Sequence, residues 1–348
     1  MQLTPATHQL LVPPTPLRAA ISDPHQCAVA DLVTPYRDDA EHSALLLGVP
    51  FDTTTLGRAG SRHAPRAIRD ALAGLLGFDA DTGTDLSDLA PVGDLGDVDV
   101  LHTDVDATWD RITSVTRELA AHDAPLVVLG GDHGLTFPVL RGLVADGGRR
   151  LGVVNLDAHY DLRPSYHGQP ASGVPFRYAL ERLDGAIRGE SCTHIGVTGW
   201  ANSHAAAAYA DRVGLRAFSG AELRSGSLEQ IVTEAVARGT TDTDGLWISV
   251  DIDVVDGAFA PGTSSPTIGG IDSRELLRLV HLLAQAPQVV GIDVVEVAPQ
   301  YDVSGITAKL AAVAVVTFLA ARHAASASKT EETGDSLPAA TSGEGSLR

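Results

Sequence analysis

Short apolar runs alternate with amphipathic segments along most of this chain. The apolar runs are typical of strands buried on both faces of a sheet, and they occupy residues 44–50, 125–129, 151–156, 193–197, 246–250 and 289–295. Between the first two runs, Trp109, Ile112, Val115 and Leu119 recur at helical spacing, which predicts an amphipathic helix over residues 106–122. Such alternation predicts a parallel sheet covered by helices on both faces, in one α/β domain.

Further helices are predicted from residues suited to a helix N-terminus. Pro65, after a glycine-containing loop, suits the first turn of a helix. Ser227 with Gln230, and Asp272 with Glu275, have the spacing of a capping box. The remaining helices are expected over residues 136–144, 176–183 and 307 to about 323.

Three stretches lack the pattern of the central domain, which we expect to span residues 40–323. Residues 1–39 are rich in proline and are predicted to form an arm that lies over the surface or reaches a neighbouring subunit. Residues 79–99 are acidic and rich in turn residues, so we interpret them as an insert. Residues 324–348 are small, polar and unpatterned, which predicts a disordered tail.

Charge and composition argue against several classes of protein. A formal net charge of −19 disfavours nucleic acid or an anionic membrane as the partner. Two cysteines, Cys27 and Cys192, make no disulfide framework, so a cytoplasmic location is expected. The N-terminus lacks a secretory pattern, and the longest apolar segment, residues 310–321, is short for a membrane span and predicts a buried helix.

Polar side chains that strands do not need follow four of the predicted strands. They are Asp132 and His133, then Asp157, His159 and Asp161, then Asp251 and Asp253, and finally Glu296. Sites in open α/β sheets lie beyond the carboxyl ends of the strands, so these residues are expected to converge. Residues two apart in an extended segment share one face, which brings the three side chains of 157–161 together. Gathering so many carboxylates is costly unless a cation lies among them.

Six of these residues suit a pair of metal ions that share carboxylates. They are His133, Asp157, His159, Asp161, Asp251 and Asp253. These four carboxylates and two imidazoles are more ligands than one catalytic ion needs, and oxygen-rich sites with some imidazole suit Mn²⁺. Two ions about 3.5–4 Å apart lower the pKa of a shared water and position it for attack. The sequence therefore predicts a pair of Mn²⁺ ions in each subunit and a hydrolytic reaction.

Three motifs carry a resemblance to a known family. GGDHG at 130–134, NLDAHYDLR at 155–163 and SVDIDVVDGAFAPGT at 249–263 together resemble the signatures of the ureohydrolases, the arginase–agmatinase–formimidoylglutamase family. The likeness covers roughly residues 44–320. It implies a three-layer α/β/α sandwich with a mostly parallel sheet of about eight strands, assembled as a homo-trimer or hexamer. It also implies hydrolysis of a small cationic guanidine or amidine, with release of urea or formamide.

The resemblance also implies roles for the polar residues. His133, Asp157, Asp161 and Asp251 would hold one manganese ion, and His159, Asp157, Asp251 and Asp253 the other, with Asp157 and Asp251 bridging. Glu296 matches the carboxylate that pairs with the cationic group of the substrate, and we count Asp161 and Glu296 among the catalytic residues. The alternative for Glu296 is a solvated residue that merely follows a strand.

The segment after the second motif resembles formimidoylglutamase more than other members of this family. Arginases and agmatinases carry a His-Gly pair there, whose histidine moves a proton, whereas this chain has Ser172-Gly173-Val174-Pro175-Phe176. We therefore expect Ser172 to contact the substrate. His167 is a candidate general acid because its ordinary pKa is near neutrality, and the alternative is a plain loop histidine. Gly134 is a further departure, since serine is usual beside that metal ligand.

The tail of the substrate is the second feature that distinguishes the candidate substrates. N-formimidoyl-L-glutamate has two carboxylates, which call for arginines, while agmatine has none. Arg163 and Arg177 are expected to bind the substrate, with Arg58 and Arg62 nearby; the alternative for each is to balance acidic neighbours. The first expectation is hydrolysis of N-formimidoyl-L-glutamate to L-glutamate and formamide in histidine breakdown. The alternatives are an agmatinase or guanidinobutyrase that releases urea, and a non-catalytic member, which should have lost ligands that this chain retains.

Overall fold

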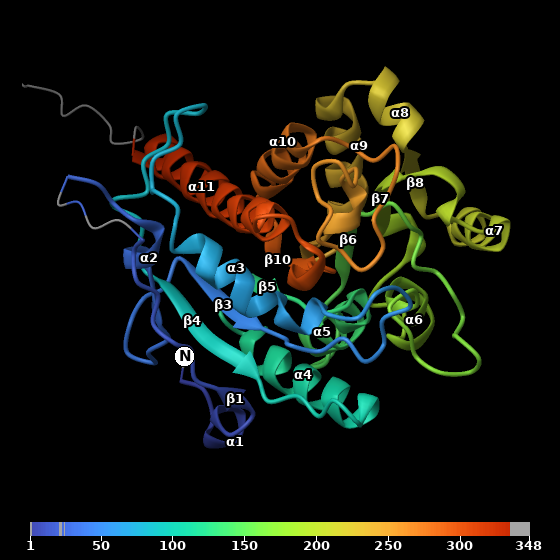
Figure 1. The fold of residues 1–348 in the computed structure, drawn as a ribbon, viewed down its shortest axis with the longest axis horizontal. Helices are drawn as coiled ribbons and strands as arrows, with labels where there is room; N and C mark the ends of the chain where they lie inside the picture. The colour runs from blue at the N-terminus through green and yellow to red at the C-terminus, as the bar shows by residue number, and fades with distance from the viewer. Residues whose placement is uncertain (1, 21–22, 24, 335–348) are drawn as a thin grey trace, which may run out of the picture.

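The computed structural model describes residues 2–20, 23 and 25–334, with the backbone alone described for 327–334. A mixed, mostly parallel sheet lies at its centre (Figure 1). Its strands are β1 (Leu11–Val12), β2 (Val33–Pro35), β3 (Ala44–Gly48), β4 (Val92–Val98), β5 (Leu126–Leu129), β6 (Leu151–Leu156), β7 (Cys192–Val197), β8 (Arg216–Ser219), β9 (Gly245–Asp251) and β10 (Val289–Val295). Within the described residues the order is β1-β4-β3-β5-β10-β9-β6-β7-β8, and β2 also pairs with β4. Only the pairing of β1 with β4 is antiparallel among these strands, so the predicted α/β class is confirmed.

Helices form one layer on each face of this sheet. One layer contains α3 (Ala64–Leu72), α9 (Leu228–Thr240), α10 (Ser273–Ala284) and α11 (Ile306–Gly334), whose apolar residues pack in one core. The opposite layer contains α4 (Val105–Leu119), α5 (Thr136–Leu143), α6 (Pro175–Arg182) and α7 (His204–Val213), which pack in a second core. Along β3, Leu46 belongs to the first core and Leu45 and Leu47 to the second, as expected for a strand buried on both faces.

Three further helices are short, and the expected helix starts are observed. The short helices are α1 (Pro5–His8), α2 (Val29–Leu32) and α8 (Gly220–Ser225). Pro65 lies in the first turn of α3, and Asp272 and Glu275 form both bonds of a capping box on α10. Ser227 caps α9 by accepting from the Gln230 amide, but it donates its own hydroxyl to Glu229.

Two stretches join the sheet contrary to the sequence analysis. β4 lies within residues 79–99, which were expected to form an insert, and β1 and β2 lie within the N-terminal arm. The sheet therefore has ten strands in the described residues rather than about eight. Arg69 of α3 explains the acidic strand, because its guanidinium lies 2.8 Å from Asp94 and 2.7 Å from Asp97 of β4. This pairing allows carboxylates that resemble turn residues in the sequence to enter the sheet.

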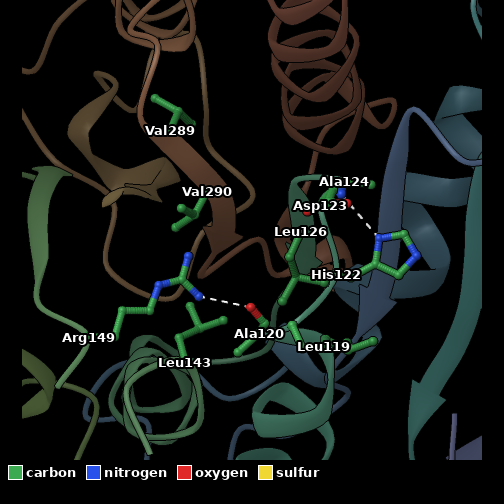
Figure 2. A pocket seen from close by; sticks show the side chains of 11 residues that line it. Leu119, Ala120, His122, Asp123, Ala124, Leu126, Leu143, Arg149, Val289 and Val290 are labelled. Atoms are coloured by element: carbon green, nitrogen blue, oxygen red, sulfur yellow. Dashed lines mark hydrogen bonds between the residues drawn. The ribbon is translucent and has the colours of Figure 1, made fainter. Parts of the chain in front are cut away.

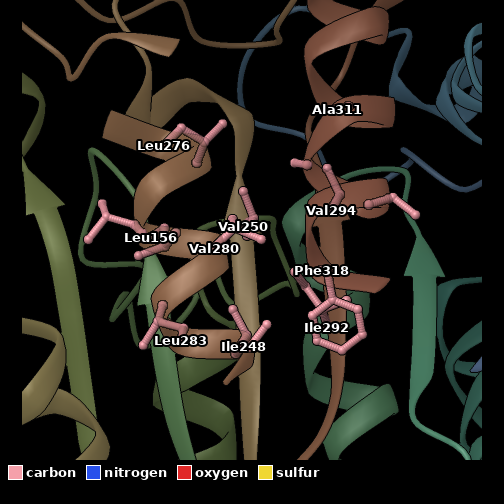
Figure 3. Close-up of a cluster of buried hydrophobic side chains, with 14 of the residues drawn as sticks. Leu156, Ile248, Val250, Leu276, Val280, Leu283, Ile292, Val294, Ala311 and Phe318 are labelled. Atoms are coloured by element: carbon pink, nitrogen blue, oxygen red, sulfur yellow. The ribbon is translucent and has the colours of Figure 1, made fainter. Parts of the chain in front are cut away.

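The last helix is longer than expected and forms part of the core. α11 continues past His323 to Gly334, so the first part of the predicted disordered tail is helical, and residues 335–348 lie outside the described residues. Within the described residues, the segment Ile306–Ser326 is long and apolar enough to cross a membrane by length and composition. However, 61% of its most apolar window is buried inside the protein, which is typical of a core helix. Phe318 and Ala311 share a buried cluster with Ile292 and Val294 of β10 (Figure 3).

We predict that Phe318→Ala lowers the free energy of unfolding by about 3–5 kcal/mol, because the lost ring leaves a cavity between α11 and the sheet. Urea denaturation followed by circular dichroism measures this change. Val303→Ala is the matched control, since Val303 is exposed and its truncation should change the stability by less than about 0.5 kcal/mol. Equal stability of the two variants would contradict the placement of α11 in the core.

Candidate metal centre

Four adjacent strands bring the expected ligands together. β5, β10, β9 and β6 are neighbours in this order and run parallel, so their carboxyl ends share one edge of the sheet. The short helix η2 (His133–Leu135) follows β5, and η5 (Ile252–Val254) follows β9 directly. Segments far apart in the sequence therefore meet at one place, as the sequence analysis expected.

Six side chains form two groups of candidate metal ligands. In the first group, Nδ1 of His133 lies 2.9 Å from Asp161 Oδ2, 3.2 Å from Asp251 Oδ2 and 3.3 Å from Asp157 Oδ2. In the second group, Nδ1 of His159 lies 3.1 Å from Asp253 Oδ2 and 3.4 Å from Asp157 Oδ1. Within each group the candidate ligand atoms lie within 4.8 Å of one another, and Asp157 belongs to both groups. Asp251, which was expected to bridge as well, belongs to the first group only.

The donor set fits divalent metal ions. Asp157, Asp251, Asp253 and His133 are at most 3% exposed, so water does not screen their charges. His133 Nδ1 and Asp253 Oδ1 are buried and have no hydrogen-bond partner among the described residues. Buried polar atoms without partners are rare in folded proteins, and His133 Nδ1 here faces three carboxylates. These residues can therefore hold two ions through oxygen and imidazole donors, as Mn²⁺ prefers.

The shifted pKa values of the ligand side chains show that their negative charges are costly without positive charge nearby. Burial raises the pKa of Asp251 well above its usual range and that of Asp253 to about 6, with neighbouring carboxylates adding to the Asp251 shift. The negative charge of Asp253 raises the pKa of His159. Burial lowers the pKa of His133, but the close carboxylates of Asp157, Asp161 and Asp251 more than reverse this effect. Protons or metal ions must therefore balance the carboxylates.

Glu296 lies beside the ligands in a constrained conformation. It follows β10 and has φ of +65°, in the left-handed region that non-glycine residues seldom adopt. Its Oε1 accepts a hydrogen bond from the backbone amide of His133 at 2.8 Å, and its Oε2 accepts one from the Ser264 hydroxyl. Burial raises the pKa of Glu296 well above its usual range. A cationic group that approaches this carboxylate would offset part of the cost of its burial.

A cavity of about 300 Å³ opens over the cluster. Ligand residues and Glu296 form part of its wall, and the complete lining is Leu56, Gly57, His159, Asp161, Arg163, Ser172, Gly173, Ala201, Asp251, Asp253, Ser264, Ser265 and Glu296. A second cavity, of about 230 Å³, lies at the amino ends of β5 and β10 (Figure 2). There Arg149 donates to the carbonyl of Ala120 after α4, and the wall contains no expected site residue. The first cavity is therefore the candidate active site.

Two residues that were expected to move a proton or to bind the substrate, His167 and Arg177, do not line this cavity. His167 lies on an exposed turn closed by hydrogen bonds between Tyr166 and Gln169, with φ of +50°, so its ring is not placed as a general acid. Arg177 donates to Glu181, and its guanidinium lies 3.6 Å from the ring centroid of Tyr209. Each side chain has partners or surroundings away from the cavity, which spacing along the sequence did not reveal, so this geometry does not support either assignment.

Arg58 and Arg62 are also engaged elsewhere. Arg58 donates to the Pro261 and Thr263 carbonyls and lies 4.2 Å from the ring centroid of Tyr301, while Arg62 pairs with the buried Asp52. These contacts hold the loop of residues 52–63 at the cavity mouth.

Arg163 and Ser172 do line the cavity. Ser172 Oγ accepts from the Leu56 amide at 3.2 Å. Arg163 is exposed, and its guanidinium makes no hydrogen bond or ion pair among the described residues. Of the four arginines considered, Arg163 alone therefore faces the cavity without another partner.

Steric hindrance explains why position 134 is occupied by glycine. A Cβ atom added to Gly134 would lie 2.5 Å from Thr54 Oγ1 and 2.9 Å from Asp132 Oδ1. Asp132 accepts hydrogen bonds from the Thr54 hydroxyl, the Thr54 amide and the Gly134 amide, and burial raises its pKa to about 7. Thr54 therefore occupies the space that a side chain at position 134 would need.

Three buried residues that support the ligands were not predicted from the sequence. Asn155 donates to Asp157 at 3.1 Å, and Ser249 Oγ lies 3.0 Å from His133 Nε2 and donates to Asp293 at 2.6 Å. All three are fully buried. The available signal was a polar residue inside an otherwise apolar strand, which requires a partner when both faces are covered.

Comparison with known proteins identifies the family. Residues 42–321 match the arginase family. The chain is 32% identical over 303 residues to a formimidoylglutamase from Halalkalibacterium halodurans, covering 86% of this chain and 94% of the relative. It is 37% identical over 287 residues to a guanidinopropionase from Pseudomonas aeruginosa, covering 82% and 88%.

Solved structures give the same result for the fold. Formimidoylglutamase from Bacillus subtilis superimposes with a TM-score of 0.82 at 29% identity, covering 87% of this chain and 94% of that one. Formiminoglutamase from Trypanosoma cruzi, crystallised with Mn²⁺, superimposes with a TM-score of 0.78 at 22% identity, covering 85% and 98%. The matched family, the arginase-like fold and the paired ligand groups agree. The chain belongs to the arginase family and is a metal-dependent amidinohydrolase.

Proposed function

We propose that this enzyme hydrolyses N-formimidoyl-L-glutamate to L-glutamate and formamide at a pair of Mn²⁺ ions. Similarity to formimidoylglutamases over most of the chain supports this substrate, as does the Ser172-Gly173 edge of the cavity. The observation that carries the proposal is the free guanidinium of Arg163 in the same cavity as Glu296. The cavity therefore offers a carboxylate for an amidinium group and a cation for an anionic tail.

In this proposal the two ligand groups each hold one ion. His133, Asp157, Asp161 and Asp251 hold the first, and His159, Asp157 and Asp253 hold the second. The ions supply an electrophilic site that lowers the pKa of water toward neutrality and orients it. Asp157, which belongs to both groups, keeps the two sites together.

Glu296 orients the reacting end of the substrate. Two donors, the His133 amide and the Ser264 hydroxyl, hold its carboxylate, which leaves oxygen lone pairs available for an amidinium or guanidinium. Because burial makes its negative charge costly, Glu296 gains most from a cationic partner, which selects cationic over neutral groups.

Arg163 recognises the other end. Its amide donates to the Gly173 carbonyl at 2.9 Å, and Gly173 leaves room for the Arg163 side chain, since an added Cβ atom would lie 3.0 Å from Cδ. A free guanidinium attracts a carboxylate tail and repels the terminal ammonium group of agmatine. This contrast favours an acidic substrate over agmatine.

A single free arginine also favours a second candidate, an ω-guanidino acid such as guanidinobutyrate, with release of urea. Such a substrate carries one carboxylate, whereas formimidoylglutamate carries two. The guanidinopropionase relative, at 37% identity, supports the same alternative. Both candidates share the amidinium or guanidinium group at Glu296 and the anionic tail at Arg163.

We predict that the Mn²⁺-loaded enzyme releases formamide from N-formimidoyl-L-glutamate and leaves agmatine unchanged. The measurement is formamide and urea release over a panel that contains N-formimidoyl-L-glutamate, agmatine, guanidinobutyrate and guanidinopropionate. Urea from a guanidino acid, with no turnover of formimidoylglutamate, would select the second candidate. Turnover of agmatine alone would contradict both.

We predict that Arg163→Ala lowers kcat/KM for the acidic substrate roughly 10- to 150-fold, because a charge-assisted hydrogen bond contributes about 1.5–3 kcal/mol. Steady-state kinetics provide the measurement. Arg177→Ala is the matched control, since it removes an arginine whose partners are Glu181 and Tyr209. A larger effect of Arg177→Ala than of Arg163→Ala would disprove the assignment of the anion-binding residue.

We predict that the protein holds two Mn²⁺ ions per chain near pH 8 and binds them progressively more weakly as the pH falls. The raised pKa values of Asp251 and Asp253 mean that protons compete with the metal, and lower pH favours the protonated carboxyls. Metal analysis after gel filtration at each pH tests this. Occupancy that stays constant down to pH 5 would argue against these carboxylates as ligands.

A further inference from the structure

A row of four polar side chains crosses the buried sheet beneath the metal ligands. Asp293 of β10 pairs in register with Ser249 of β9, Ser249 with Asn155 of β6, and Asn155 with His194 of β7. All four side chains are fully buried. We call them the polar row. Ligands Asp251 and Asp157 follow Ser249 and Asn155 by two residues, so they project from the same face of the sheet.

Ser249 connects the polar row to one ligand. Its hydroxyl donates to Asp293 Oδ1 at 2.6 Å, so its oxygen is left to accept from Nε2 of His133 at 3.0 Å. Asp293 Oδ2 accepts from the Trp247 indole at 2.8 Å and from the Thr136 hydroxyl at 3.0 Å. Because the carboxylate of Asp293 only accepts, the Ser249 hydroxyl donates to it, and the Ser249 oxygen then accepts from His133.

The consequence for His133 is a fixed ring orientation. With Nε2 donating to Ser249, Nδ1 is the nitrogen that faces Asp161, Asp251 and Asp157. The second histidine ligand differs, because the His159 side chain is 22% exposed and has no hydrogen bond to the polar row among the described residues. The polar row therefore supports the histidine of the first ligand group through Ser249 and, within the described part of the chain, makes no such bond to the histidine of the second group.

We propose that Ser249 and Asp293 are positioning residues for one of the two metal ions, acting through His133. Hydrogen bonds to the outer nitrogen of a ligating histidine set its orientation and its basicity as a ligand. Loss of the Ser249 hydroxyl should therefore weaken the ion held by His133 and leave the ion held by His159 in place. The inference rests on the paired Mn²⁺ site of the proposed function.

The alternative is that the polar row only joins β9, β10 and α5. Thr136→Val separates these roles, because it removes a hydrogen bond to Asp293 but leaves the link from Ser249 to His133 intact. Ser61→Ala is the control for deleting a buried hydroxyl, since Ser61 Oγ is buried without a partner among the described residues.

The experiment is a Mn²⁺ titration of the full chain and its variants, followed by metal analysis and by electron paramagnetic resonance. Wild-type protein should bind two ions and give the signal of a coupled pair. Ser249→Ala should bind one ion about 10- to 100-fold more weakly and give the signal of an isolated Mn²⁺ at intermediate metal concentrations. Thr136→Val and Ser61→Ala should match the wild type.

Three results would overturn the inference: unchanged affinity in Ser249→Ala, equal weakening of both ions, or the same loss in Thr136→Val. If Ser249→Ala does not fold, Ser249→Cys, whose thiol is a weaker donor and acceptor, is held to the same criterion. Wild-type protein that binds fewer than two ions would instead contradict the proposed function. Two ions in the wild type with no effect in the Ser249 variants would contradict this inference alone.

Discussion

Negative charge concentrated at the carboxyl ends of four parallel strands is the constraint on which the rest of the structure depends. Asp157, Asp161, Asp251 and Asp253 converge there. Burying like charges side by side costs several kcal/mol per group unless positive charge lies among them. Imidazoles supply part of that charge, and the geometry of the two ligand groups suits divalent ions for the remainder. In the proposed function, a cationic substrate group adds to the same charge balance at Glu296.

The surrounding fold maintains this arrangement because mostly apolar side chains cover both faces of the sheet. Two separate cores cover the faces, so the ligand-bearing strands cannot shift without exposing apolar surface. Left-handed backbone at Asp161 and Glu296 costs about 1–3 kcal/mol at each residue, and such conformations persist only where neighbouring contacts determine them. The amide of Glu296 bonds to the Gly131 carbonyl, which ties β10 to the loop after β5.

The proposed recognition of an acidic substrate depends on which arginines already have partners within the protein. Arg69 neutralises two aspartates of β4, Arg62 pairs with Asp52, and Arg58 and Arg177 have partners outside the cavity. Further arginines of this chain, whose net charge is −19, also form ion pairs with acidic residues, among them Arg111, Arg141 and Arg216. Among the described residues no side chain pairs with the Arg163 guanidinium at the cavity, and the proposed preference for an acidic tail depends on it.

The sequence by itself determined most of the buried strands, several helix starts and the six candidate ligands, because these depend on local pattern and on spacing within single segments. The match of Asp157, His159 and Asp161 to one face of an extended segment is such a local property. Only the tertiary structure decided that β4 belongs to the sheet, that Arg177 contacts Glu181, and that His167 faces solvent. Each of these outcomes depends on a partner supplied, or withheld, by a segment distant in the chain, and no local pattern records that partner.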